Sequence, residues 1–69
     1  MNMYYWRDIE AFFKSLNARR RVVEFAQLRF DELTEGGDRI SGSHLGVVFA
    51  DNVRARDFRA FYATQHARK

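Results

Sequence analysis

A regularly spaced set of apolar residues between positions 22 and 33 constrains the fold more than any other feature of this chain. At 100° per residue, six apolar side chains fall on one arc of about 160° of an α-helix. They are Val22, Val23, Phe25, Ala26, Phe30 and Leu33. The opposite side carries polar residues such as Glu24, Gln27 and Asp31. The stretch from Arg19 to Gly37 therefore predicts a helix whose apolar face the rest of the chain must cover.

The chain is short for covering the whole apolar face of this helix. Its 69 residues form one domain at most, and folding at this size removes only about 60% of the unfolded surface from water. There is no cysteine to form a disulfide or a thiolate zinc site. His44 and His66 lack a regular ligand spacing, so we expect no metal and no cofactor. Eleven aromatic residues are a large number for so small a core, and we expect some of them to face a second copy in a homodimer.

The segments on either side of the central stretch also read as helices. From Tyr4 to Leu16 the apolar side chains share an arc of about 120°. A last helix is predicted to begin with Asp51 or Asn52 as its cap and to run to about Ala67. The predicted fold is mainly α: a small bundle of three to four helices in a single domain, residues 1–69, completed by dimerisation.

The connection between the first two helices has two interpretations. Asn17 is a suitable cap for a second helix. That helix, however, would carry Arg19, Arg20 and Arg21 in its first turn, where positive charge opposes the helix dipole. One continuous helix from Tyr4 to Glu35 avoids the conflict and would be about 48 Å long, which suits an intertwined dimer. The sequence leaves both open.

The glycine-rich stretch after the central helix is the main flexible part of the chain. All four glycines lie between positions 36 and 46, and either Gly36 or Gly37 is expected to be the left-handed residue that ends the helix. Beyond it, Ser43 is placed to cap a short helix over 44–52. Alternatively, residues 45–49 alternate as a strand that pairs with 21–30, which gives an α-β-β-α fold with a central hairpin.

The same stretch does not predict catalysis. Gly37 and Gly42 have the spacing of a phosphate-binding loop, but Ser43 and His44 stand where lysine and then serine or threonine are required. Ser41, Ser43 and His44 are adjacent in a loop, and no orienting acid is indicated for them. We therefore expect a protein that is not an enzyme.

Two binding surfaces are predicted instead. The first would bind a protein, because aromatic residues and arginine dominate interface energetics; it consists of Tyr4, Tyr5 and Trp6 at the exposed start of the chain, with Leu28 outside the apolar arc of its helix. The second would contact the phosphates of DNA or RNA. Its residues are Arg19, Arg20, Arg21, Arg54, Arg56 and Arg59.

From these surfaces the sequence predicts a small regulator or inhibitor that binds another protein, with nucleic-acid binding as the alternative. Proteins of this kind are common in phages and mobile elements. No apolar run approaches the roughly 20 residues that span a bilayer, and the first helix has a polar face of zero net charge, unlike membrane-surface helices. We therefore expect no membrane association and a cytoplasmic location.

Overall fold

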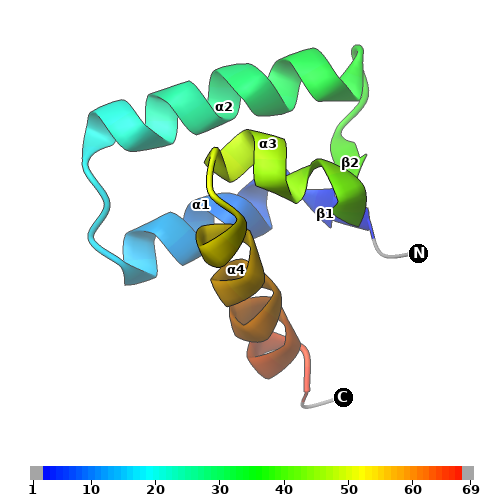
Figure 1. Cartoon of the computed structure of the whole chain (residues 1–69). Helices are drawn as coiled ribbons and strands as arrows, with labels where there is room; N and C mark the ends of the chain where they lie inside the picture. Colours follow the sequence, from blue (N-terminus) through cyan, green and yellow to red (C-terminus); the bar gives the residue numbers. More distant parts are fainter. Residues whose placement is uncertain (1–2, 68–69) are drawn as a thin grey trace.

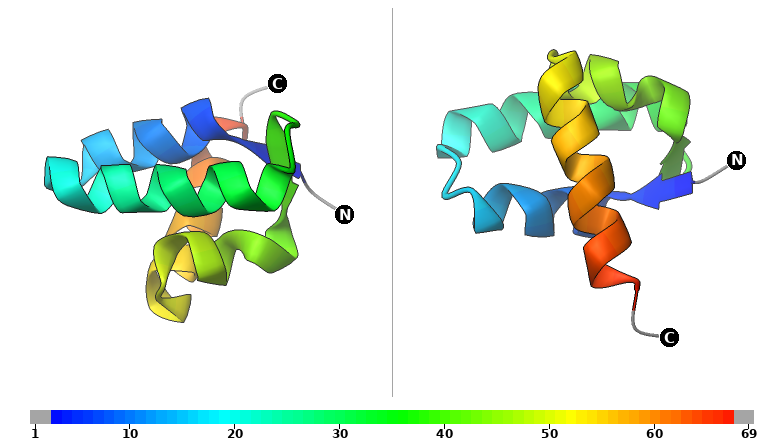
Figure 2. Two further views of the ribbon diagram at one scale, coloured as in Figure 1. Left: turned by 90° about the horizontal axis from the view of Figure 1, so that it is seen from above. Right: turned by 60° about the horizontal axis from the view of Figure 1, so that its bottom comes forward.

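The computed structural model describes residues 3–67 and confirms a mainly α fold (Figure 1). Two short strands and four α-helices follow one another in this part of the chain. The elements are β1 (Met3–Tyr5), α1 (Trp6–Ser15), α2 (Arg20–Thr34), β2 (Arg39–Ser41), the 3-10 turn η1 (Gly42–His44), α3 (Leu45–Phe49) and α4 (Asn52–Gln65). Helices α1 and α2 run in opposite directions as the two arms of a helical hairpin, and α4 crosses α1 steeply (Figure 2).

The strands β1 and β2 pair antiparallel and join the start of the chain to the segment after α2. The central pair is Tyr4 with Ile40, and both side chains are buried. This contact, not local helix propensity, keeps Tyr4 extended, so the expectation that the first helix begins at Tyr4 is wrong by two residues. The two strands also differ from those considered for a central hairpin, since residues 21–30 and 45–49 are helical.

The core is built around one aromatic cluster. Phe58 of α4 is fully buried, and its ring lies 5.2 Å from Tyr4, 5.6 Å from Phe12 and 5.6 Å from Phe49. Rings at these separations attract one another beyond their burial. Among residues 3–67, eleven apolar residues form the buried core, namely Tyr4, Ile9, Phe12, Phe13, Ala26, Phe30, Ile40, Leu45, Val48, Ala55 and Phe58. Much of this core therefore consists of aromatic rings that pack against one another within a single copy of the chain.

Helices α1 and α2 are separated by a turn at Asn17. This residue is left-handed, with φ of 53°. The Asn17 N–H donates to the Lys14 carbonyl at 3.1 Å, and the Ala18 N–H donates to the Phe13 carbonyl at 3.0 Å. This pair of bonds is the Schellman motif, which satisfies the last carbonyls of a helix. Asn17 therefore ends α1 instead of capping α2, and the continuous helix over 4–35 does not form.

At the remaining helix ends, the structure confirms some predictions and corrects others. Helix α2 ends with two left-handed residues, Glu35 at φ 50° and the predicted Gly36 at φ 91°. Asp51 caps α4 as expected, accepting bonds from the Val53 and Arg54 N–H groups at 2.8 and 3.3 Å. Ser43 does not cap a helix, because it lies inside η1. Within residues 3–67, none of the helices has both the length and the apolar content that crossing a bilayer requires.

Candidate functional site

The outer face of α2 carries large apolar side chains that the described residues leave about half exposed. Val22 is 45% exposed, Phe25 52% and Leu28 60%. They follow one another at three-residue intervals, so they share an arc of about 120° on the helix. Figure 1 shows why they are open to solvent: α2 lies along one edge of the molecule, and the other helices are all on its inner side. We call these three residues the α2 outer face.

The wide apolar arc of α2 is therefore divided between the core and the surface. Ala26 and Phe30 are fully buried, and Val23 and Leu33 are partly buried against the core. The expectation that Val22 and Phe25 also face the core is wrong. The sequence held a signal of this outcome, because a helix that buries one stripe needs only about 100° of apolar surface, and this arc is about 160°.

Arg29 borders the outer face and fastens α2 to α3. Its Nη1 atom donates to the carbonyl oxygen of Val48 at 3.5 Å. Its guanidinium carbon also lies 5.9 Å from the centre of the Phe25 ring, within the range of a cation–π contact. The face thus combines an aromatic ring, aliphatic side chains and an arginine, a composition that is enriched in protein–protein interfaces.

Charge is divided along the length of α2. Arg19, Arg20 and Arg21 are exposed at its start, and Arg20 pairs with Glu24 at 3.1 Å on the helix surface. Acidic residues follow at its other end, with Asp31, Glu32 and Glu35 all exposed. Neither end complements the helix dipole, since cations lie at the positive end and anions at the negative end. This charge pattern therefore weakens the isolated helix.

The four residues predicted to bind a protein do not form one patch. Tyr4 is 3% exposed and packs edge-on against Phe58 and Tyr62, so placing it in an exposed patch was wrong. Trp6 is half-buried, with its ring 5.6 Å from Phe30. Tyr5 is half-buried and its hydroxyl accepts a 3.5 Å bond from Arg39. Of the four, only Leu28 is largely exposed, at 60%, and its surface neighbours on α2 are Val22 and Phe25.

The two arginine groups predicted to bind nucleic acid lie apart. In every view of Figures 1 and 2, the start of α2 with Arg19–Arg21 is separated from α4, which carries Arg54, Arg56 and Arg59. The α4 arginines also point around different sides of their helix, and Arg59 donates to the carbonyl oxygen of Gly42 at 2.8 Å. One chain therefore does not present the six residues as a single basic surface.

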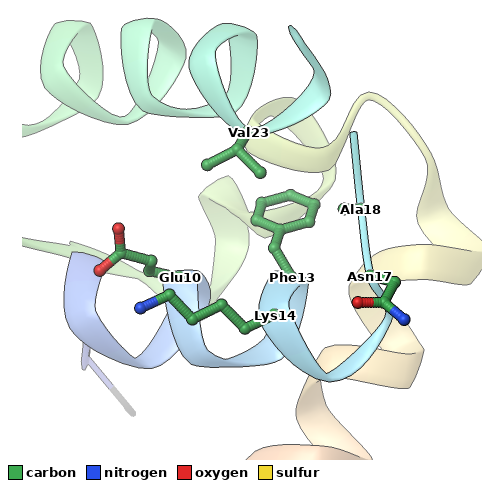
Figure 3. Close-up of a pocket in the computed structure, with 6 residues that line it drawn as sticks. All are labelled: Glu10, Phe13, Lys14, Asn17, Ala18 and Val23. Carbon is green, nitrogen blue, oxygen red and sulfur yellow. The ribbon is translucent and has the colours of Figure 1, made fainter. Parts of the chain in front are cut away.

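A cavity of about 300 Å³ opens between α1 and α2 beside the break at Asn17 (Figure 3). The Phe13 ring points toward Val23 across it, and Glu10 and Lys14 run side by side along its edge. Ala18 and Asn17 complete the lining. Polar and apolar side chains therefore contribute equally to the lining of the cavity.

Ser41 at the end of β2 and Ser43 and His44 of η1 do not form a connected chain of nucleophile and base. The Ser41 and Ser43 hydroxyl oxygens lie 2.7 Å apart. The Nδ1 atom of His44 is buried and has no hydrogen-bond partner. His66 is far along the sequence, stacked on Tyr62 with ring centres 4.0 Å apart. Across residues 3–67, no three side chains of histidine, aspartate or glutamate gather where one metal ion could bind them.

No protein-family model, no curated protein and no solved structure matches this chain.

Proposed function

We propose that this chain is a small cytoplasmic regulator or inhibitor that acts without catalysis, by binding a protein through the α2 outer face. The observation that carries the proposal is the exposure of Val22, Phe25 and Leu28 on one helix face. Isolated exposed apolar residues are ordinary on protein surfaces, but a contiguous group with a neighbouring arginine is typical of interaction sites.

Covering this face would contribute part of the free energy of binding to a partner. Fully burying one exposed aliphatic or aromatic side chain contributes about 1.5–3 kcal/mol. Each of the three side chains is roughly half exposed, so covering all three contributes on the order of 3 kcal/mol. That free energy corresponds to about a 100-fold gain in affinity, before any contribution from Arg29 or from the rim of the contact.

The test is affinity capture with the tagged full chain in an extract of the cell that produces it, with and without nuclease. Leu28→Glu places a charge at the most exposed residue of the α2 outer face. The matched control is Val53→Glu, because Val53 is 55% exposed but lies in the first turn of α4. Thermal melting of both variants establishes that each is folded.

We expect the wild-type chain to retain a protein after nuclease treatment, Leu28→Glu to lose it, and Val53→Glu to keep it. Capture that is insensitive to Leu28→Glu contradicts the proposal. Capture that disappears with nuclease and weakens steeply with salt contradicts it too, and favours the nucleic-acid alternative through Arg19–Arg21.

A further inference from the structure

We propose that the partner of the α2 outer face is a second copy of this chain, with the two α2 helices packed antiparallel about a two-fold axis. This inference rests on the proposed docking role of the outer face and specifies its occupant. It is carried by the order of charges and apolar groups along one exposed stripe of α2.

The stripe consists of Arg21, Phe25, Leu28 and Glu32, all exposed. Their spacing of four, three and four residues places them within an arc of about 60°, on the side of α2 opposite Phe30. This is the spacing of the contact seam in coiled coils, in which two helices cross at about 20° and stay in contact along the seam. Read along the helix, the stripe is basic, apolar, apolar and acidic.

That order is complementary to itself only when the helices are antiparallel. The register that sets Phe25 opposite Leu28 of the partner subunit also sets Arg21 opposite Glu32 of the partner subunit, because both pairs share one midpoint. The two-fold axis repeats each pair, as it must in an isologous dimer. A parallel arrangement would instead place arginine against arginine and glutamate against glutamate. The acidic half of the stripe also opposes contact with a phosphate backbone.

Charge exchange tests the arrangement with the full chain. We expect wild-type protein to sediment in low salt at twice the monomer mass of 8.2 kDa. Arg21→Glu and Glu32→Arg each create two like-charge contacts per dimer, and each should weaken self-association by roughly 10- to 100-fold. The 1:1 mixture of the two variants should recover a dimer, as should the double variant. Arg56→Glu on α4, a control of the same charge change, should have no effect.

Cysteine cross-linking tests the direction of the helices, since the natural chain has no cysteine. Mixed Arg21→Cys and Glu32→Cys chains should form a disulfide between them. Either variant alone should not form a disulfide. In antiparallel helices the two copies of position 21 are about 16 Å apart along the helix axis, whereas a disulfide requires Cα atoms within roughly 4–7 Å. A cross-link from Arg21→Cys alone overturns the antiparallel arrangement.

The outcomes separate this inference from the proposed function. If the wild-type chain stays monomeric at millimolar concentration while Leu28→Glu still abolishes protein capture, self-pairing is refuted and the docking role survives. If the chain is monomeric and Leu28→Glu does not change protein capture, both self-pairing and the docking role of the α2 outer face are refuted. A dimer that neither single charge variant weakens refutes the stripe as its interface.

Discussion

Ala50 provides a sharp test of the backbone conformation, because replacing it with glycine should stabilise the protein. It occupies the left-handed region at the end of α3, with φ of 55° and ψ of 28°. That conformation costs an L-residue about 1–2 kcal/mol. The Ala50 side chain is exposed, so its methyl group contributes little packing. Glycine relieves this strain. It also increases the conformational entropy of the unfolded chain, which lowers the stability of the folded state by about 0.4–1 kcal/mol. The net effect is an increase of about 1 kcal/mol in the free energy of unfolding.

The assay is thermal unfolding followed by circular dichroism. A change of about 1 kcal/mol shifts Tm by about 4–8 °C in a domain of this size, so Ala50→Gly should melt that much higher than the wild type. The control is Ala60→Gly, the same substitution at an exposed position within α4. Within a helix, glycine lowers the free energy of unfolding by about 1 kcal/mol relative to alanine, so Tm of this variant should fall by about 4–8 °C. If both variants lower Tm, the argument from the Ala50 conformation is refuted.

Two further substitutions test the cap and the corrected position of the first tyrosine. Asp51→Ala removes the side chain that accepts from the first N–H groups of α4, and should cost about 1 kcal/mol in urea unfolding, whereas Asp51→Asn should retain most of the stability. Tyr4→Ala deletes a buried ring and should cost about 3–5 kcal/mol, whereas Val53→Ala, at an exposed position of α4, should change stability by less than about 0.5 kcal/mol. Equal costs for Tyr4→Ala and Val53→Ala would contradict the assignment of Tyr4 to the core.

The sequence alone was sufficient where a short segment decides its own structure. The apolar spacing of residues 4–16 correctly predicted a helix with one apolar face. Ile9, Phe12 and Phe13 on that face are buried, whereas Leu16 on the same face is 44% exposed. Asp51 was recognisable as a cap because its side chain bonds residues only two and three positions away. The stop after α2 was likewise predictable, since Gly36 adopts a left-handed conformation at little cost.

Tertiary structure decided the candidate site. Periodicity identified α2 as a helix, but an apolar arc of about 160° does not reveal which part of it the neighbours will cover. The packing of α1 and α3 buried Phe30 and left Phe25 exposed. In the same way, Tyr4 is extended because it pairs with Ile40, a residue distant in the sequence.

The physical reason for this division is the range of the interactions. Helix periodicity, capping and glycine conformations depend on residues within a few positions of each other. The sequence by itself therefore determined that the fold is mainly helical, and it located the end of α2 and the cap of α4. The face of α2 that stays open depends on how much surface the other helices can cover, and only the packed chain decides that. In a domain of 69 residues the covering elements are few, which leaves Val22, Phe25 and Leu28 in contact with solvent.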